Sequence, residues 1–437
     1  MTTPIFDFVK KYALSDTTRF HMPGHKGRGV LGVEAYDITE ISGADVLYGA
    51  EGIINESENN LSTLYGTAHS FYSTEGSTLA IKAMLRLVSE RQDEERPLII
   101  AARNVHASFV KAAALLDLDV EFIYPKYKEH LCSCNISVND VKVAIEGAKT
   151  KPVAVYLTSP DYLGNMLDIA GICALCREKG IPVLVDNAHG AYLNFLAENM
   201  HPMALGATMC ADSAHKTLPV LTGGAYLHIS KDYSEYASRA REALSLFAST
   251  SPSYLTLCSL DLCNERLAGD YPEKIRTLSD TLCDAKKKIT HLGFEILDSE
   301  PLKIVLKGGC IADHIRKYGI EPEFADNDYT VLMLTPENTD EELDKLLSAL
   351  AELKTRPQKS EMISVTPHKR VMAIRRAVLS PSEDISVNDA VGRICASPTV
   401  SCPPAVPIVV SGESIEKEDV SLFKYYGIET VRVVKEI

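Results

Sequence analysis

Residues 207–217 read ATMCADSAHKT, an apolar run that passes directly into a polar segment containing Ser213, His215 and Lys216. The apolar run has the length and composition of a buried β-strand, and Pro219 marks a turn soon after it. A lysine just past a buried strand is costly to desolvate unless it has a chemical role, and a desolvated lysine is a good former of Schiff bases. Ser213 and His215 flank this lysine and are able to donate hydrogen bonds to a phosphate. The alternative interpretation is a surface turn whose lysine points into water.

Short apolar runs of the same kind alternate with helical periods from about residue 76 onward. This alternation predicts an α/β fold with a mainly parallel sheet, because apolar runs between helices are typical of buried parallel strands. The last run is expected to be antiparallel, since only about seven residues separate it from the run before and a crossover helix needs more. The predicted strands are 97–102, 120–125, 152–157, 181–186, 207–212 and 224–229, and the predicted helices include 77–91, 106–116, 137–147, 168–179 and 234–248.

A smaller α/β pattern follows a long charged helix predicted over 270–291. Its last helix begins after Thr339, which forms a capping-box signature with Glu342. We therefore predict an N-terminal arm, a large α/β domain, a small α/β domain and a C-terminal domain, with a charged linker over 354–361. The predicted domain boundaries are 1–50, 51–268, 269–355 and 356–437, with further strands at 293–298, 302–307, 329–335, 406–412 and 429–434.

A second polar segment lies about thirty residues upstream, where the strand IPVLVD (181–186) ends in Asp186. The carboxyl ends of strands in open α/β sheets are the places where ligands bind. An acid at this position is able to hold a protonated pyridine nitrogen. The alternative is an ordinary N-cap or loop aspartate.

Two further segments carry groups that suit a phosphorylated aromatic ligand. Gly76, Ser77 and Thr78 begin an apolar helix, where free N–H groups, hydroxyls and the helix dipole favour an anion, although a simple N-cap is the alternative. His106 follows the next predicted strand and is able to stack flat on a ring, although a lone loop histidine is the commoner case.

Composition excludes several classes of protein. The 437 residues contain 45 Lys and Arg against 59 Asp and Glu, and this charge of −14 argues against nucleic acid as the main partner. No apolar run is long enough to span a membrane and the N-terminus lacks a signal-peptide core, so we expect a cytoplasmic protein without a membrane partner. Among the eleven scattered cysteines, Cys173 and Cys176 lack a second pair nearby, so we expect buried thiols and no metal site.

The four polar segments together match the requirements of pyridoxal 5'-phosphate (PLP). They supply a phosphate site, a ring platform, a partner for the pyridinium nitrogen and a lysine for the aldehyde. Their order along roughly 140 residues resembles that of the fold-type I PLP enzymes, the aspartate-aminotransferase superfamily. This resemblance implies a large domain with a mainly parallel sheet, followed by a small α/β domain and a C-terminal extension.

A longer motif narrows the resemblance. Residues 20–27 read FHMPGHKG, which resembles the F-H-x-P-G-H-K-G signature of the bacterial Orn/Lys/Arg decarboxylase family. The resemblance implies a PLP-dependent decarboxylase, a lyase that converts arginine, lysine or ornithine to an amine and CO₂ in polyamine metabolism. It continues over nearly the whole chain, through Asp45 and segments 52–56, 159–164, 186–189, 213–222, 249–254, 320–323, 403–407 and 412–413.

The resemblance also implies individual roles. Lys216 is the Schiff-base lysine, Asp186 pairs with the pyridine nitrogen, and His106 and Ala188 contact the two ring faces. His189 occupies a position that varies between aromatic residues and histidine, and Lys216 or His189 is the implied proton donor to Cα. The phosphate is implied to be held by the helix start at Gly76 and by Ser77, Thr78, Ser213, His215 and, across a homodimer interface, Thr250.

Three positions depart from the family pattern. Glu75 stands where relatives often have asparagine, and Asn187 replaces a common glutamate. Gly223 stands where a larger residue is frequent, so we expect more open surroundings there. The long enzymes of the family carry an N-terminal regulatory wing domain, and the start of the motif at Phe20 leads us to expect that this chain lacks it.

Several alternatives remain open at this point. Another PLP reaction on the same fold, such as transamination, is one, although the FHMPGHKG motif argues against it. A catalytically silent regulator is another, although every ring and phosphate position is present. The sequence does not decide which basic amino acid is the substrate, and the acids that could bind its distal cation lie in segment 45–56 and at Glu323 and Glu413. We expect a homodimer or a larger homo-oligomer.

Overall fold

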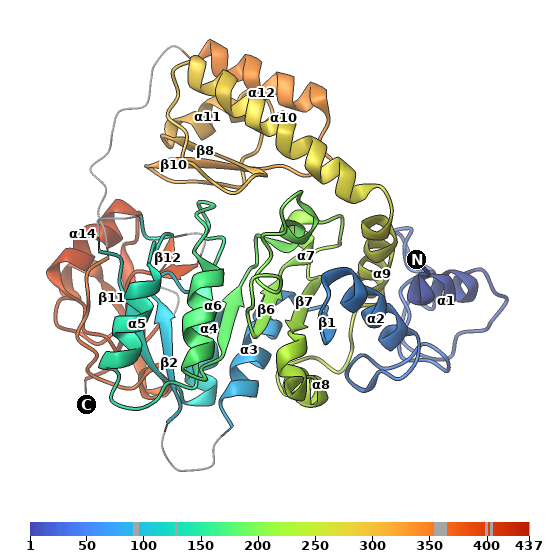
Figure 1. Ribbon diagram of the computed structural model, residues 1–437, viewed down its shortest axis with the longest axis horizontal. Coiled ribbons are helices and arrows are strands. Elements are labelled where there is room, and N and C mark those ends of the chain that lie inside the picture. Colours follow the sequence, from blue (N-terminus) through green and yellow to red (C-terminus); the bar gives the residue numbers. More distant parts are fainter. Residues whose placement is uncertain (91–95, 127–129, 354–364, 398–400, 403–404, 437) are drawn as a thin grey trace. The chain divides into compact units, whose positions relative to one another are not determined.

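The computed structural model describes residues 1–90, 96–126, 130–353, 365–397, 401–402 and 405–436. The described chain forms two compact units. Figure 1 labels their helices and strands. The first unit comprises residues 1–88 and 182–276, and the second comprises residues 89–181 and 277–437. The α/β class predicted from the sequence is confirmed by the alternation of strands and helices in both units.

The first unit contains four neighbouring strands in the order β1, β7, β6, β5. The pair β5 and β6 is parallel, whereas β7 runs antiparallel to both β6 and β1. The predicted antiparallel direction of the last strand is therefore confirmed. The strands are β1 (His69–Ser73), β5 (Val183–Asp186), β6 (Met209–Asp212) and β7 (Ala225–Ile229).

The helices of the first unit surround these strands, and α3 packs on β6, β7 and α8. The predicted helix over 234–248 is divided, because Tyr233 has non-helical backbone angles and a 3-10 helix precedes α8. The helical elements are α1 (Pro4–Ala13), η1 (Leu47–Gly49), α2 (Ile53–Tyr65), α3 (Gly76–Val88), η2 (Ala191–Phe195), α7 (Ala214–Thr217), η3 (Lys231–Tyr236), α8 (Ala237–Ser245), α9 (Tyr254–Ala268) and α10 (Tyr271–His291), which runs on into the second unit.

The second unit contains three parallel strands in the order β4, β2, β3 and a separate antiparallel sheet in the order β8, β10, β9. Its helices include α12, whose capping box at Thr339 and Glu342 confirms the sequence signature. The elements are β2 (Leu98–Ala102), α4 (Ala107–Leu116), β3 (Asp119–Ile123), α5 (Val138–Gly147), β4 (Ala154–Thr158), α6 (Ile169–Glu178), β8 (Lys303–Lys307), α11 (Cys310–Arg316), β9 (Phe324–Ala325), β10 (Tyr329–Met333) and α12 (Asp340–Glu352).

The C-terminal part of the second unit has its own apolar core around Ile408, Val409 and Phe423. It is built from α13 (Ile374–Leu379), β11 (Ser382–Ser386), η4 (Val387–Asp389), β12 (Ser401–Cys402), β13 (Val406–Pro407), α14 (Lys417–Tyr425) and β14 (Thr430–Val434).

Three further predictions, two strands and a linker, are not confirmed as made. The predicted strand 293–298 is wrong, because only one isolated bridge joins Ile296 to Leu306. The predicted strand 406–412 shrinks to β13, and the Arg103 side chain donates to the carbonyls of Pro407 and Ile408. The predicted linker 354–361 lies outside the described residues.

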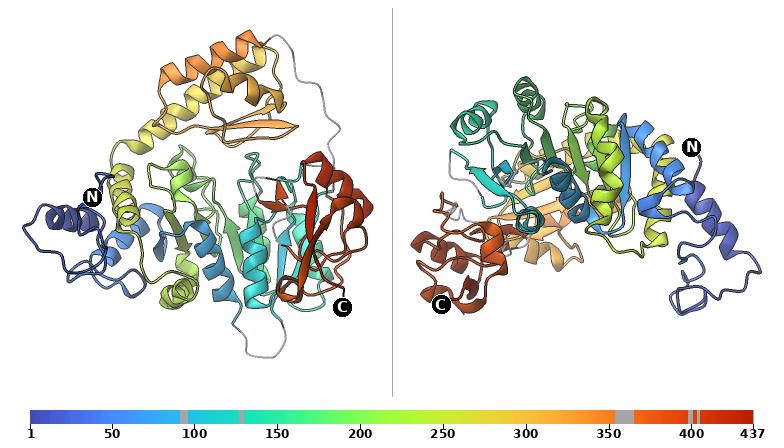
Figure 2. Two further views of the ribbon diagram at one scale, coloured as in Figure 1. Left: turned by 180° about the vertical axis from the view of Figure 1, so that it is seen from behind. Right: turned by 90° about the horizontal axis from the view of Figure 1, so that it is seen from below.

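A buried carboxylate fastens α1 to α9. Asp261 is fully buried, and its Oδ2 atom accepts the main-chain N–H groups of Ile5 and Phe6 at 2.9 Å each. An acidic side chain beside the first free N–H groups of a helix accepts their hydrogen bonds and interacts favourably with the positive end of the helix dipole. Segment 14–46, which follows α1, contains neither helix nor strand and extends from the edge of the first unit in Figure 2.

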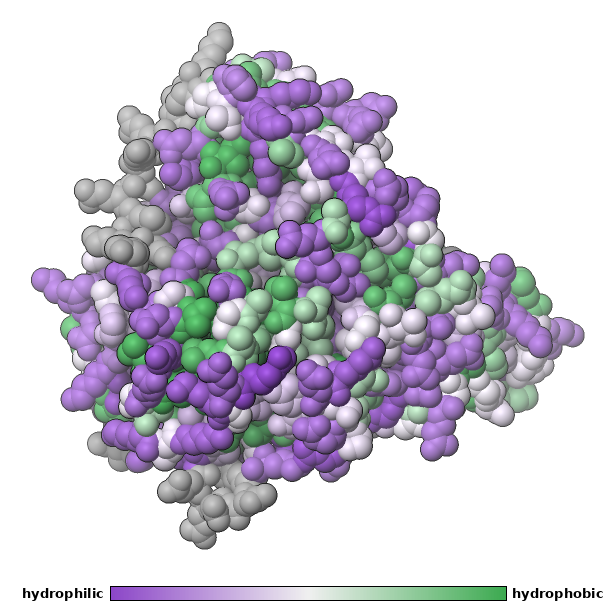
Figure 3. All heavy atoms as spheres, in the orientation of Figure 1, coloured by the Kyte–Doolittle hydropathy of each residue, from purple (hydrophilic) through white to green (hydrophobic). Residues whose placement is uncertain are grey.

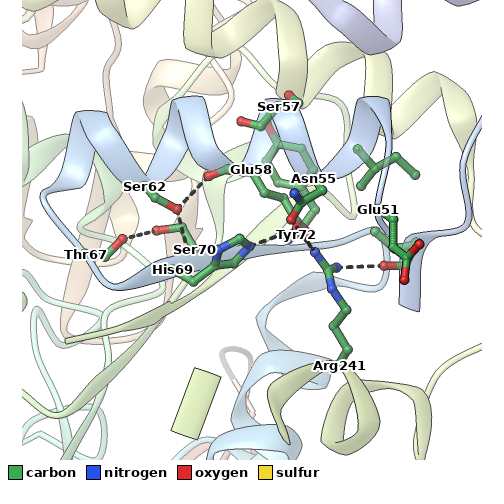
Figure 4. Close-up of polar contacts among 12 residues, drawn as sticks. Glu51, Asn55, Ser57, Glu58, Ser62, Thr67, His69, Ser70, Tyr72 and Arg241 are labelled. Carbon is green, nitrogen blue, oxygen red and sulfur yellow. Dashed lines mark hydrogen bonds and ion pairs between the residues drawn. The ribbon is translucent and has the colours of Figure 1, made fainter. Parts of the chain in front are cut away.

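A second buried carboxylate joins α2, β1 and α8 (Figure 4). Glu58 is fully buried, and its Oε2 atom lies 2.6 Å from Arg241 Nη2 and 3.2 Å from His69 Nε2. Its Oε1 atom accepts the main-chain N–H of Tyr72 at 2.9 Å. The partners lie on β1 and α8, so the carboxylate on α2 fixes the packing of three elements.

Hydrophilic side chains cover most of the face shown in Figure 3, as expected for a chain with many charged residues. Among the described residues, no helix is both long enough and apolar enough to cross a membrane.

Candidate active site

The candidate site in the first unit begins at the ends of two parallel strands. Strand β5 ends at Asp186 and β6 ends at Asp212, so their carboxyl ends meet at one edge of the sheet. The Asp186 side chain is buried, with 3% of its surface exposed, and its Oδ1 atom accepts the N–H of Ala188 at 3.3 Å. His189, which follows Ala188, is also buried.

The predicted Schiff-base lysine lies close to this edge. Lys216 belongs to the short helix α7, which begins immediately after Ser213. Its Nζ atom is 3.0 Å from His189 Nε2. At this distance an amine and an imidazole exchange a proton directly, because one nitrogen donates while the other accepts. The structure thus brings together two of the residues that the sequence analysis singled out.

Residues predicted to hold the phosphate also lie together within this unit. The Ser213 hydroxyl donates to the Ser77 hydroxyl at 2.8 Å, which joins the end of β6 to the first turn of α3. The main-chain N–H of Gly76 donates to the Gly223 carbonyl at 2.8 Å. Two hydroxyls beside the N-terminus of a 13-residue helix form a suitable place for an anion.

Gly223 has a structural reason for being glycine. Its φ angle is +95°, and a Cβ atom added there would lie 2.7 Å from the carbonyl oxygen of Thr74. That carbonyl fills space that the sequence led us to expect open. The backbone at Gly223 therefore braces the loop that leads into α3.

The remaining predicted residues of the first unit surround this arrangement. His215 donates from Nδ1 to the Gly224 carbonyl at 2.9 Å, and Thr78 follows Ser77 in the first turn of α3. Thr250 is exposed, in the segment between α8 and α9. Glu75, one of the departures from the family pattern, accepts the N–H of Ser249 at 2.7 Å. This hydrogen bond ties the segment to the start of α3.

His106 belongs to the second unit. It is the N-cap of α4, and its Nδ1 atom accepts the N–H of Ser108 at 3.1 Å. The role of His106 as a ring platform therefore stays a prediction.

The acids considered for a substrate cation fall into two groups. Both carboxylate oxygens of Asp45 accept main-chain N–H groups, including those of Gly52 at 2.9 Å and Ile54 at 3.0 Å. Glu413 is 2% exposed, accepts the N–H of Val410 at 2.8 Å and lies 3.8 Å from Arg103, so it stabilises the C-terminal part. In contrast, Glu323 is exposed and accepts from the Tyr162 hydroxyl at 2.7 Å.

The donor set of the first unit fits PLP. Lys216 supplies an amine beside a histidine, Asp186 supplies a buried carboxylate, and Ser77 and Ser213 supply adjacent hydroxyls at a helix N-terminus. These are the groups that an aldehyde, a pyridine nitrogen and a phosphate require.

Comparison with known proteins identifies the family. The family model described as Orn/Lys/Arg decarboxylase, major domain, matches residues 3–299, and the model of the C-terminal domain matches residues 353–431. The chain belongs to the Orn/Lys/Arg decarboxylase family. The members of this family are PLP-dependent amino-acid decarboxylases, which are lyases. The resemblance predicted from the sequence is therefore confirmed.

Relatives of the decarboxylase family match over nearly the whole chain. The arginine decarboxylase of Bacillus subtilis is 31% identical over 97% of this chain and 93% of its own length. The arginine decarboxylase of Bacillus anthracis is 30% identical over 99% of this chain and 97% of its own length. An uncharacterized protein of Bacillus subtilis is 29% identical over 96% of this chain and 93% of its own length.

Solved structures confirm the fold-type I architecture of the decarboxylase family. A lysine decarboxylase of Francisella novicida aligns with a TM-score of 0.82 at 16% identity, covering 99% of this chain and 81% of its own. The constitutive lysine decarboxylase of Escherichia coli aligns with a TM-score of 0.80 at 16% identity, covering 99% of this chain and 82% of its own. At this identity the likeness concerns the fold alone.

The sequence analysis missed one polar group next to the site. Asp212 is fully buried directly before Ser213, and it contacts His201, His228 and Asn187. Neither histidine lies in a motif, so their importance is visible only from their contacts with Asp212 in the folded structure.

The C-x-x-C pair behaves as expected for buried thiols. Cys173 and Cys176 lie on the buried side of α6. Burial raises the pKa of Cys173 to about 12 and that of Cys176 to about 11. Both thiols therefore stay protonated and unreactive at neutral pH.

Proposed function

We propose that this protein uses PLP to decarboxylate a basic amino acid, arginine, lysine or ornithine, giving the corresponding amine and CO₂. Membership of the family supports the reaction class, and the arginine decarboxylases among the relatives support a basic substrate. The observation that carries the proposal is the meeting of Lys216 with His189 beside the strand that ends in Asp186.

Each predicted site residue has a defined task in this proposal. Lys216 holds the aldehyde carbon of the cofactor, and Asp186 keeps a proton on the pyridine nitrogen. Ser77, Thr78, Ser213 and His215, with the start of α3 at Gly76, hold the phosphate, while Ala188 and His106 contact the ring. When bound, the cofactor supplies an electron sink for the bond to the leaving carboxylate.

Asp186 suits its task because of its surroundings. A buried carboxylate has a strong preference for a cationic partner, since an unpaired buried charge is costly. A protonated pyridine nitrogen provides such a partner, and the charge pair keeps the ring able to accept electrons.

Lys216 and His189 are the two candidates for the proton that Cα receives after CO₂ leaves. Their nitrogens are 3.0 Å apart, so a proton on either one is available to the other. We propose that the pair acts together, with His189 holding the proton while the Lys216 amine is occupied.

The alternative of transamination requires an arginine for the α-carboxylate of the substrate. Arg375 and Arg376 are exposed on α13, and Arg375 donates to the carbonyl of Leu115 at 2.8 Å. Nothing about these two arginines favours a role in substrate binding.

We also propose a homodimer in which Thr250 contacts the phosphate of the neighbouring subunit. Two observations support a second copy. Thr250 is exposed, and segment 14–46 carries large apolar side chains on its surface, with Phe20 94% and Val30 99% exposed. Such side chains usually have a partner surface.

A hybrid experiment tests the shared site. Lys216→Ala and Thr250→Ala are each expected to lower activity as homodimers. In a mixed dimer, one site would contain both substitutions and the other neither, so activity should return. Mixed dimers that stay inactive would contradict the shared site, and a fully active monomer in sedimentation would contradict the homodimer.

A cytoplasmic location and a role in polyamine metabolism complete the proposal. The ten cysteines with described side chains are thiols and not disulfides, which supports a reducing compartment. Amines made from basic amino acids are the precursors that polyamine metabolism uses.

The decisive experiment is product analysis. The purified protein, supplied with PLP, is incubated separately with arginine, lysine and ornithine, and agmatine, cadaverine and putrescine are measured together with CO₂. We expect one amine to form in step with CO₂, and Lys216→Ala to form none. A keto acid instead of CO₂ would indicate transamination, and failure to bind PLP would favour a regulatory protein.

A further inference from the structure

The strand ends that carry the site are joined on their other face. Asp186 pairs with Ala211 in the parallel register of β5 and β6, so the following pair, Asn187 and Asp212, points to the opposite side of the sheet. The Asn187 side chain donates from Nδ2 to Asp212 Oδ1 at 2.8 Å. Asn187 directly follows Asp186, and Asp212 directly precedes Ser213.

The Asp212 carboxylate accepts hydrogen bonds at both oxygens. Oδ1 accepts from Asn187 and, at 3.2 Å, from the Cys210 thiol. Oδ2 accepts from His201 Nε2 at 2.9 Å and from His228 Nε2 at 3.2 Å. All five side chains are fully buried, and four bonds match the capacity of a carboxylate.

The hydrogen bonds identify the donor atom of both histidines. Met203 donates its N–H to His201 Nδ1 at 3.3 Å, so His201 donates to Asp212 from Nε2. Burial lowers the pKa of His228, which is therefore neutral, and its Nδ1 atom accepts from the Ser70 hydroxyl at 2.7 Å.

Asp212 keeps its negative charge in this environment. Burial by itself would raise the pKa of Asp212, but the interactions with His201 and His228 outweigh it and hold the pKa well below the usual value. The Cys210 thiol stays protonated because burial raises its pKa. The Tyr65 ring closes the cluster by stacking on His228 with a centroid distance of 4.4 Å.

We propose that Asp212 is a positioning residue for the cofactor site. Through Asn187 its charge fixes the distance between the end of β5, with Asp186 and Ala188, and the end of β6, with Ser213. A main-chain bond from Asn187 N to Ala211 O at 3.0 Å joins the same two ends. This inference rests on the proposed function, because it concerns the spacing that PLP requires.

The test substitutes Asp212→Asn in the full chain. The shape is conserved, and the chain can adapt, because Asn187 Oδ1 has no hydrogen-bond partner among the described residues and its amide can turn to accept from the new side chain. Asp261→Asn is the matched control, because Asp261 is equally buried in the same unit but holds α1 and not the strand ends.

The readout is the dissociation constant of PLP, obtained by titrating the apoprotein and following visible absorbance. We expect Asp212→Asn to weaken PLP binding by at least about tenfold, because a hydrogen bond to a charged group is replaced by a weaker one between neutral groups. Asp261→Asn should change it by less than about twofold. If Asn187 carries the effect, Asn187→Ala should weaken binding similarly, and the double variant should be no worse than Asp212→Asn.

Each outcome decides between clear alternatives. Unchanged PLP affinity in a folded Asp212→Asn protein would overturn the proposal, as would equal losses in Asp212→Asn and Asp261→Asn. If Asp212→Asn does not fold, Asn187→Ala decides alone, since it removes the link and leaves the two histidines with Asp212. A wild-type protein that binds no PLP would instead refute the proposed function.

Discussion

The strand-end site and the buried cluster around α2 are both polar, lie in the same unit and use their polar atoms differently. At the strand ends, Ser77 and Lys216 remain partly exposed, and Ser213 is buried beside Ser77. In the α2 cluster, the Glu58 carboxylate is fully buried and binds Arg241, His69 and the main chain of Tyr72.

This difference separates polar groups that can bind a ligand from polar groups that hold the fold together. A buried carboxylate whose oxygens already accept several hydrogen bonds has little capacity left for a substrate. Partly exposed groups that converge at a helix N-terminus still have capacity. Substitutions in the two regions should therefore change different measurable quantities.

The largest expected effect is the loss of turnover in Lys216→Ala. Without the amine, PLP has no covalent anchor, so the visible absorbance of lysine-bound pyridoxal and amine production should both disappear. The free energy of unfolding should change by less than about 0.5 kcal/mol, because Lys216 is only partly buried. Lys231→Ala, at an exposed lysine of η3, is the control and should retain activity. Wild-type turnover in Lys216→Ala would refute the assignment.

Arg241→Ala should have the opposite profile. Removing this partner leaves the buried Glu58 charge without its cation, which typically costs about 3–5 kcal/mol of unfolding free energy. Because the Arg241 side chain is 20% exposed, we expect the lower end of that range. Chemical denaturation measures the loss, and Glu242→Ala, at an exposed position of the same helix, should stay within about 0.5 kcal/mol. A stable but inactive Arg241→Ala protein would contradict the comparison.

Asp261 should make stability depend on pH. Burial raises its pKa from 3.8 to about 6. The folded protein therefore binds the proton more tightly than the unfolded chain, so this contribution is present below about pH 4 and is lost as pH rises through about 6. The loss is at most about 3 kcal/mol, from roughly two pKa units at 1.36 kcal/mol each.

Asp261→Asn tests this dependence, because asparagine does not titrate. Relative to the wild type, its free energy of unfolding should rise between pH 4 and pH 7 by up to about 3 kcal/mol. Asp212 should act in the opposite direction, because its pKa is lowered in the folded protein. It contributes stability at pH values above the usual pKa of a carboxylate, and this stability is lost in acid. Parallel pH profiles for Asp212→Asn and Asp261→Asn would show that the two carboxylates do not differ as described.

Asp186→Ala should reduce turnover by at least about tenfold, which corresponds to about 1.4 kcal/mol of barrier. Some PLP should remain bound, because Lys216 and the phosphate site are intact. The measurement is the rate of CO₂ release at saturating PLP, with Asp280→Ala at an exposed position of α10 as the control. A decrease smaller than tenfold would mean that Asp186 does not control the pyridine nitrogen.

The parallel strands were predictable because each is an apolar run that can be recognised from neighbouring residues alone. The runs that became β5 and β6 are apolar, and each ends visibly where Asp186 or Asp212 begins a polar segment. A buried strand needs apolar side chains on both faces, so this pattern survives in the sequence. The short interval before β7 likewise predicted its antiparallel direction.

Strand β1 and helices α2 and α9 were not predicted as elements. Strand β1 reads HSFYS, and its Ser70 is buried against His228. The buried face of α2 carries Ser57 and Glu58, and that of α9 carries Asp261. Polar residues on buried faces interrupt the apolar period on which sequence interpretation depends.

What the sequence by itself determined is the set of candidate reactive groups and their order. The helix start at Gly76, Asp186 and Lys216 stand next to apolar strands, and such local patterns need no knowledge of distant contacts. Only the tertiary structure decided which other polar residues matter. Glu58 is paired with Arg241 and Asp212 with His201, and a carboxylate is stable in the interior only when partners from other elements meet it there. These partners are fixed by packing, which a linear pattern does not contain.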